Sequence, residues 1–304
     1  MNTKSLSELI NEVTTNNRMS KKAKFEAIVK LGVTPYEAMI IAEASMPIRT
    51  RVSRPTFSFT FGVEIECVGC EFDAFRRAAT DNGLSVYGQF NYNHTDMPQY
   101  KLTTDSSISG SNAAECVTPP LNGTTAGFDS LKACCKSLAE IGARVNHSCG
   151  LHVHIGAADL TDEEYCAVFV NYMRLETAIE SFLAPSRRGS HARWCRSLRN
   201  YEADVLNATT KDKMYRALGG SRYHRVNPVA YVAHRTIEFR QHQGTTNYTK
   251  IAHWVKFLAK LVEYSKNHRI EANIDRIEDI PFLSAAEKNY FCNRRGEFEA
   301  RGAR

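Results

Sequence analysis

Apolar and polar residues alternate strictly over residues 57–67, FSFTFGVEIEC, which begin two residues after Pro55. One face of this predicted strand carries only Phe, Val, Ile and Cys, whereas the other carries polar residues and a glycine. Shorter strands with the same period are predicted at 100–105, 113–118, 149–156 and 235–242. The chain therefore has five candidate strands, whose order in a sheet the pattern does not show.

Helical spacing of apolar residues accounts for much of the remaining chain. It predicts helices over 126–143, 210–218 and around 251–262, and a longer helix that begins at the capping box Thr161-x-x-Glu164 and ends near Pro185. Strands separated by helices and loops are typical of an α+β fold. We therefore expect a mostly antiparallel, curved sheet with helices on one face.

The two ends of the chain follow different patterns. Residues 1–54 read as short amphipathic helices, and the tail at 269–304 is weakly patterned. We therefore expect an N-terminal helical extension over 1–54, a catalytic domain over 55–268 and a C-terminal tail. The apolar positions of the predicted extension are Leu6, Ile10, Val13, Phe25, Ile28, Val29 and, after Pro35, Met39, Ile40 and Ile41.

Composition narrows the class of protein. The 304 residues are 43% hydrophobic and 24% charged, which is typical of a globular protein and excludes the disordered and collagen-like classes. No apolar stretch approaches the ~20 residues of a membrane span, and the first residues lack the features of a signal peptide. The nine cysteines are an odd number and mostly scattered, so we expect reduced thiols and a cytoplasmic location, in a host cell if the chain is viral.

A formal charge of +6 is spread along the chain, but it is densest at 187–199, RRGSHARWCRSLR. Trp194 in this run is able to stack on a nucleobase, whereas the simpler interpretation is a solvated basic loop. The charge alone does not separate these two interpretations.

Charged side chains recur on the polar faces of three predicted strands. Because side chains alternate, Glu64 and Glu66 project from one face about 7 Å apart, and His152 and His154 share a face in the same way. Glu238 and Arg240 form a third pair, and His242 is expected to continue their row. A face that was merely wet would favour Lys and Thr instead.

Two further acids fall near this predicted face. Glu115 lies in a short strand that Pro119 and Pro120 end, and Asp105 closes another strand. Several converging carboxylates repel one another unless cations neutralise them, and carboxylate-rich sites with one or two histidines suit Mg²⁺ or Mn²⁺. Arg240 would add a fixed positive charge suited to a phosphoryl group, so the pattern points to Mg·ATP.

Four motifs, GVEIE, ECVTPP, CGLHVHI and RTIEFR, occur in this order and together resemble the amidoligase family. This family belongs to the carboxylate-amine ligases with a glutamine synthetase-like catalytic fold, and the resemblance covers roughly residues 56–265. It implies a sheet whose polar face binds ATP and Mg²⁺. By motif position it implies that the metal ligands are Glu64, Glu66, Glu115, His152 and Glu238, with Asp105 a looser match.

The resemblance also implies residues that bind phosphate. Arg240 and Arg235 resemble the phosphate-binding arginines, His154 lies beside the metal histidine, and the segment RYHRVN, with Arg222 and Arg225, is expected to reach phosphate or substrate. No GxxxxGK[ST] motif is present, which excludes a P-loop enzyme. The expected activity is ATP-dependent formation of an amide from a carboxylate and an amine through an acyl phosphate.

Three alternatives remain open at this point. His152-x-His154 with His147 and Cys149 would suit a zinc hydrolase, a phosphotransferase of the same fold would move phosphate without making an amide, and the arginines of 187–225 would suit a nucleic-acid-binding protein. Nucleic acid otherwise enters only as a substrate. The sequence leaves the acid, the amine and the oligomeric state open.

Overall fold

The computed structural model describes residues 4–16, 19, 21–33, 38, 41, 58–91, 95, 97–189, 193–300 and 302. The chain divides into two compact units, Met1–Phe57 and Ser58–Arg304. Five predicted positions lie outside the described residues: Pro35, Met39, Ile40, Pro55 and Phe57. In the part that is described, no helix combines the length and the apolar character needed to cross a membrane.

The first unit contains two of the predicted short helices, α1 (Leu6–Thr15) and α2 (Lys21–Lys30). A capping box starts α1, because the side chain of Ser5 accepts a hydrogen bond from the backbone N–H of Glu8 while the Glu8 side chain accepts one from the backbone of Ser5. Ile28 is fully buried in a small apolar cluster with neighbours from both helices. Within the predicted extension, the described residues thus form two helices, 6–15 and 21–30.

The second unit is built around an open sheet in which all seven strands pair antiparallel. Its hydrogen-bonded order is β2-β3-β1-β5-β7-β6, and β4 pairs with the first residues of β1. The fold is therefore α+β with an antiparallel sheet, as predicted. The strands are β1 (Thr60–Cys67), β2 (Lys101–Thr103), β3 (Ala114–Val117), β4 (Leu121–Asn122), β5 (Gly150–Gly156), β6 (Val226–Asn227) and β7 (Thr236–Gln243).

The four helices predicted for this unit are present. The capping box at Thr161 starts the long one, which ends at Ser181, before Pro185. The sequence pattern did not predict α4, α7, α9 or α11. The helices are α4 (Phe72–Asp81), α5 (Thr125–Glu140), α6 (Asp162–Ser181), α7 (Glu202–Asn207), α8 (Lys211–Ala217), α9 (Ala230–His234), α10 (Tyr248–Ser265) and α11 (Ala285–Ala300).

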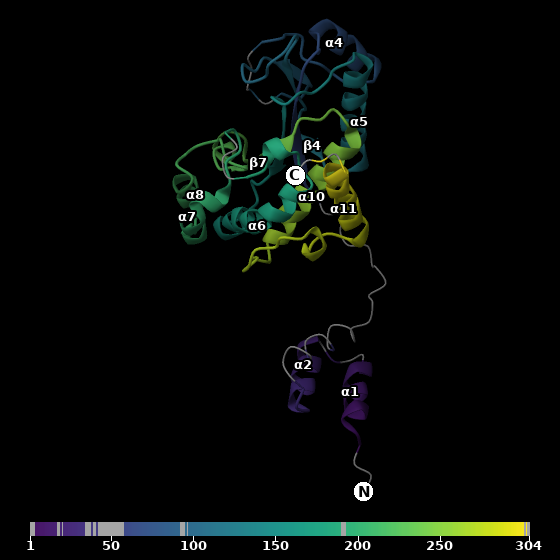
Figure 1. The fold of residues 1–304 in the computed structure, drawn as a ribbon, viewed down its shortest axis with the longest axis vertical. Helices are drawn as coiled ribbons and strands as arrows, with labels where there is room; N and C mark the ends of the chain where they lie inside the picture. Colours follow the sequence, from purple (N-terminus) through teal and green to yellow (C-terminus); the bar gives the residue numbers. More distant parts are fainter. Residues whose placement is uncertain are drawn as a thin grey trace. The chain divides into compact units, whose positions relative to one another are not determined.

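Three helices, α5, α6 and α10, pack on the apolar face of the sheet and gather beside the strands in Figure 1. The rings of Phe61 in β1 and Phe128 in α5 stack with centroids 5.1 Å apart, and Phe239 in β7 lies 5.6 Å from Tyr172 in α6. Burial of these aromatic side chains, with the aliphatic residues around them, stabilises this layer. The opposite face of the sheet is thereby left for polar side chains.

The prediction that His242 continues the row of Glu238 and Arg240 on the polar face of the sheet is wrong. The pairing of β5 with β7 contains a bulge between Leu151 and Val153, where β7 has one residue more than its partner. An extra residue shifts the alternation, so His242 turns to the apolar face, where its ring lies 5.6 Å from the ring of Trp254.

Candidate functional site

The register of the central strands brings the predicted acids and histidines together. Residues directly opposite each other in an antiparallel pair share a face of the sheet. Glu66 pairs with Glu115, Glu64 pairs with His152, and His154 pairs with Glu238. Side chains that are up to 174 positions apart, from Glu64 to Glu238, thus meet on one polar face.

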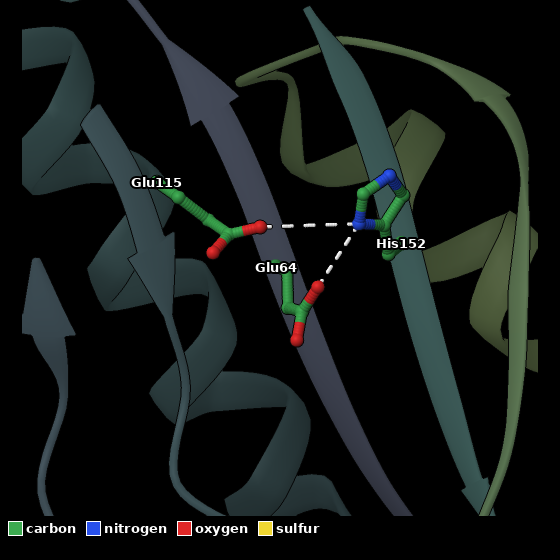
Figure 2. A group of neighbouring side chains, drawn as sticks. All are labelled: Glu64, Glu115 and His152. Atoms are coloured by element: carbon green, nitrogen blue, oxygen red, sulfur yellow. Dashed lines mark hydrogen bonds and ion pairs between the residues drawn. The ribbon is translucent and has the colours of Figure 1, made fainter. Parts of the chain in front are cut away.

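His152 is at the centre of this cluster. Its Nδ1 lies 2.9 Å from Glu64 Oε2, 3.8 Å from Glu115 Oε1 and 3.7 Å from Glu238 Oε1, and its Nε2 lies 3.4 Å from Glu66 Oε1. Figure 2 shows Glu64 and Glu115 directed toward the same nitrogen of the ring. One imidazole therefore contacts four carboxylates.

The electrostatics of the cluster separate two of its acids. Burial opposes ionisation of Glu64, but hydrogen bonds with His152 and His154 hold the pKa of Glu64 well below its usual value. Burial raises the pKa of Glu115 well above its usual value, and the negative charges of Glu64 and Glu66 raise it further. The side chains of the site alone thus supply too little positive charge to keep every acid ionised.

Three groups of these side chains have oxygen and nitrogen atoms close enough to share a metal ion, with all ligand atoms of a group within 4.8 Å of one another. Such carboxylate-rich sets with at most one histidine fit Mg²⁺ or Mn²⁺ better than Zn²⁺. The groups overlap, because Glu64 and Glu115 each belong to two of them. They are Glu64 with Glu115 and His152, Glu64 with His154 and Glu238, and Glu66 with Asp105 and Glu115.

The predicted arginine of the site, Arg240, lies beside the cluster and is largely buried. Its Nη1 donates to Glu238 Oε1, and Asn227 Nδ2 donates to the other oxygen of the same carboxylate. Burial opposes the charge of Arg240, but Glu238 and Glu64 raise the pKa of the guanidinium above its usual value. Arg240 is therefore a fixed cation, and Glu238 is held in one orientation.

A cavity of about 300 Å³, here called the polar cavity, opens over these residues. Arg222, from the segment RYHRVN, lines it, and so does Arg240. The sequence pattern does not indicate His234, because α9 is too short to give a helical period. The lining is Glu64, Thr104, Asp105, Ser106, Glu115, His152, His154, Arg222, Asn227, Val229, Ala230, Ala233, His234, Glu238 and Arg240.

Two of the predicted arginines lie elsewhere. Arg225 is fully buried, its Nη1 lies 2.9 Å from Glu176 Oε2, and its Nη2 pairs with Glu180 on the same helix, α6. Arg235 is exposed, with its guanidinium carbon 5.2 Å from the centre of the Tyr231 ring. The structure thus places Arg225 in an ion pair behind the sheet and Arg235 outside the polar cavity.

Gly150 supports the cluster, although the sequence did not single it out. Its N–H donates to Glu66 Oε2 over 2.5 Å. A Cβ at this position would lie 3.1 Å from Arg187 Nη2 and 3.2 Å from His152 Nε2. A side chain at this position would therefore crowd Arg187 and His152 unless they moved by a few tenths of an ångström.

The zinc alternative required His147 and Cys149 to join the histidine pair. His147 is exposed, and Cys149 is buried next to Asn146. Neither belongs to any of the candidate metal groups among the described residues. The candidate donor set therefore consists mainly of carboxylate oxygens, with a nitrogen of His152 or His154 in two of the three groups.

The basic run at 187–199 is not a uniformly solvated loop. Arg187 is buried and donates from Nη2 to the carbonyl oxygen of Cys149 over 2.6 Å, and Arg196 donates to Ser221 Oγ over 3.0 Å. Trp194 is 39% exposed, and the guanidinium carbon of Arg193 lies 4.5 Å from the centre of its ring. Two arginines of the run thus have structural partners within the fold.

A comparison with known families gives one match over this part of the chain. The sequence model of a family described as "Putative amidoligase enzyme" matches residues 58–262, which is more than half of the chain. The match begins two residues before β1 and ends within α10, so it includes every strand of the sheet. No curated protein matches the chain.

Proposed function

The chain belongs to the amidoligase family, and we propose that it joins a carboxylate to an amine at the expense of ATP, with Mg²⁺ bound by the acid cluster. The family indicates a ligase-type enzyme. The observation that carries the finer proposal is the convergence of four glutamates on His152 beside a buried arginine. The proposal includes the glutamine synthetase-like character of the sheet.

The chemistry of amide formation explains why such a site would need phosphate. A carboxylate does not acylate an amine at neutral pH, because it is anionic and its oxygen is a poor leaving group. In the proposed first step a carboxylate oxygen of the acid attacks the γ-phosphorus of ATP, the bond from that phosphorus to the β–γ bridging oxygen breaks, and ADP leaves. The product is an acyl phosphate, which is an activated form of the acid.

In the second step the nitrogen of the amine attacks the acyl carbon. The bond from that carbon to the phosphate oxygen breaks, inorganic phosphate leaves, and the nitrogen loses a proton. The enzyme contributes mainly by holding the reactants together and by neutralising charge.

The acid cluster would hold the metal ions. Glu64, Glu66, Glu115, His152 and Glu238 are the proposed ligands, and Asp105 is placed to join Glu66 and Glu115. Bound Mg²⁺ would neutralise phosphate oxygens and make the phosphorus more susceptible to attack. It would also lower the raised pKa of Glu115, because a nearby cation favours the carboxylate.

The cations of the polar cavity would bind the phosphates. Arg240 presents a rigid, permanently charged fork whose orientation is set by its pairing with Glu238. Asn227 keeps Glu238 in place, and Arg222 adds a second guanidinium at the cavity wall. His154 accepts from or donates to Thr236 Oγ1 through Nδ1 over 2.8 Å, which orients its Nε2 toward Glu64.

Hydroxylamine tests this proposal without knowledge of the natural amine. The purified chain is incubated with ATP, Mg²⁺, hydroxylamine and a panel of carboxylic acids, and both ADP and acyl hydroxamate are measured. We expect Arg240→Gln and Glu66→Gln to lose about 10²- to 10³-fold in hydroxamate formation, the usual cost of removing one group that stabilises developing charge. Circular dichroism and the thermal midpoint check that the variants are folded.

Arg216→Gln is the matched control. Arg216 is exposed on α8, where its Nη2 lies 3.0 Å from Asp212 Oδ2, and it does not line the polar cavity. Its loss should leave the rate within about twofold. A folded Arg240→Gln variant with the wild-type rate would refute the assignment, and a stable phosphorylated product without hydroxamate would indicate a phosphotransferase.

A further inference from the structure

A second cavity, of about 250 Å³, lies next to the polar cavity on the same face of the sheet. The two cavities share Glu64, Glu115, His154 and His234 in their linings. These four residues, here called the shared wall, include two acids of the cluster. A molecule in the second cavity would therefore meet the acid cluster along the shared wall.

The polar face of the sheet changes in character along its strands. On β1 this face carries Glu64, Gly62 and Thr60, each two positions and about 7 Å from the next. On β7 Glu238 is followed in the same direction by Thr236. The face thus passes from acids to hydroxyl groups, and Thr60 and Thr236, here called the hydroxyl end, line the second cavity.

The hydroxyl end and its surroundings offer hydrogen bonds. A Cβ added at Gly156 would lie 2.3 Å from Thr60 Oγ1, so the Thr60 hydroxyl covers the backbone there. Thr236 Oγ1 lies 2.8 Å from His154 Nδ1. Thr118, also in the lining, accepts a hydrogen bond from a backbone N–H of β1 over 3.0 Å, and a hydroxyl that accepts is also able to donate. This part of the second cavity suits a polar group.

Two cationic residues line the second cavity at separate places. Lys101 is nearly buried and pairs with Val117, which in turn pairs with Glu64, so Lys101 lies in the row of the shared wall. Arg235 comes directly before Thr236 and therefore lies at the hydroxyl end. A bound molecule would have one cation near each of its ends.

The backbone of Arg235 has a conformation that arginine seldom adopts. Arg235 ends α9 with φ 55° and ψ 32°, in the left-handed region where glycine is usual. Of the described residues other than glycine, only Asn112 also has a positive φ. The guanidinium carbon of Arg235 lies 5.2 Å from the centre of the Tyr231 ring. An arginine held where glycine would be less strained points to a use for its side chain.

We propose that the second cavity holds the acid substrate and that this substrate is a short dicarboxylic acid without an α-ammonium group. The inference rests on the proposed function, since it assumes that metal ions and phosphate occupy the polar cavity. The reacting carboxylate would lie at the shared wall near Lys101. The second carboxylate would be bound by Arg235 and the hydroxyl end.

Volume and charge set the limits of this class. A volume near 250 Å³ lies below the about 300–1,000 Å³ of pockets for drug-sized ligands, so the acid is short. The acids of the lining, Glu64 and Glu115, both belong to the proposed metal site. An α-ammonium group would therefore meet the positive charges of Lys101 and Arg235 without a carboxylate of its own.

The test is binding of a matched series of acids to the full chain with Mg²⁺ and a non-hydrolysable ATP analogue. Titration calorimetry compares glutarate with pentanoate, which lacks the second carboxylate, with monomethyl glutarate, whose second end is uncharged, and with L-glutamate. We expect glutarate to bind about tenfold more tightly than each of the others, because only glutarate offers Arg235 a charged partner without an added ammonium group.

Variants of Arg235 locate this selectivity. Arg235→Gln should lower the affinity for glutarate about tenfold and leave the affinities for pentanoate and for the ATP analogue within twofold. Arg235→Gly should give the same binding results and keep the wild-type thermal midpoint, because glycine suits a positive φ. Arg216→Gln is the control, since Arg216 is exposed and lines neither cavity.

Four results would overturn the inference. They are pentanoate or monomethyl glutarate binding as tightly as glutarate, tighter binding of L-glutamate, no binding of any acid while the nucleotide binds, and Arg235 variants that keep the preference for glutarate. Failure of the proposed function would look different, because the wild-type chain would then show no Mg²⁺-dependent binding of the ATP analogue.

Discussion

Single residues of the same type have different environments in this fold. His152 in β5 is surrounded by carboxylates. His242 lies on the neighbouring strand, β7, but packs against Trp254 on the other face of the sheet. Burial, together with the positive charges of Arg294 and Arg187, lowers the pKa of His242 to about 3. His242 is therefore neutral in the folded chain at every pH near neutrality.

This neutral histidine predicts a dependence of stability on pH. The unfolded chain protonates His242 below about pH 6.5, while the folded chain does so only near pH 3, so stability falls as pH decreases through this window. Between pH 7.5 and pH 5 the free energy of unfolding should fall by about 2 kcal/mol more in the wild type than in His242→Gln. Urea denaturation at both pH values measures the difference.

The exposed residue His147 provides the control for this experiment. His147→Gln should retain the wild-type dependence on pH. A His242→Gln variant whose stability changes with pH as steeply as that of the wild type would show that His242 does not titrate as described.

The alternation of apolar and polar residues is enough to predict which acids and histidines share the polar face of the sheet. It does not predict which acids form ion pairs with each arginine. Glu64, Glu66 and His152 follow from a period of two, because the pairing of β1 with β5 is regular over these positions. Arg225 could not be placed in this way, since its ion pair with Glu176 depends on how α6 packs behind the sheet. The orientation of His242 depended on a bulge that leaves no sequence signal.

Helix ends are the features of individual elements that the sequence shows most directly. At the start of α6, Glu164 N–H donates to Thr161 Oγ1 over 3.2 Å, and Thr161 N–H donates to Glu164 Oε2 over 2.7 Å. At the start of α5, Thr124 occupies the same position without a side-chain hydrogen bond to the helix.

This contrast gives a matched pair of variants. Thr161→Ala should lower the free energy of unfolding by about 1 kcal/mol, the usual value of such a cap. Thr124→Ala should lower it by much less, because no capping bond is lost. Equal effects in chemical denaturation would mean that the capping box does not stabilise α6.

The helices that the sequence pattern does not predict have few buried residues. In α4 only Phe75 and Ala79 are buried, and in α11 only Phe291 and Arg294. Two buried positions are too few to establish a helical period. α11 has a weak pattern of its own, so it depends on tertiary packing, whereas α4 is short but clearly amphipathic.

At the scale of the whole molecule, the C-terminal tail packs onto the region that defines the family. Phe291 of α11 is 3% exposed, and its ring lies 4.6 Å from the ring of Phe182 and 5.4 Å from that of Phe257. Both partners fall within the family match, whereas α11 begins after residue 262. The hydrophobic core therefore extends beyond the matched segment.

Removal of the Phe291 ring should consequently destabilise the entire second unit. Phe291→Ala is expected to cost about 3–5 kcal/mol, as for other buried aromatic side chains. Asn293→Ala, at an exposed position of the same helix, should cost little. If the two variants unfold at the same urea concentration, the tail does not contribute to the core.

If the acid cluster binds Mg²⁺ together with ATP, the two ligands should jointly stabilise the chain against heat. The thermal midpoint is measured with Mg²⁺ plus a non-hydrolysable ATP analogue, with each alone, with EDTA and with Zn²⁺. A ligand at 100 times its dissociation constant adds about 2.7 kcal/mol to stability, which raises the midpoint by several degrees. We expect a rise that requires both Mg²⁺ and nucleotide and that disappears in Glu66→Gln but not in Arg216→Gln. No response to nucleotide, with a clear response to Zn²⁺ alone, would contradict the account and favour a zinc hydrolase.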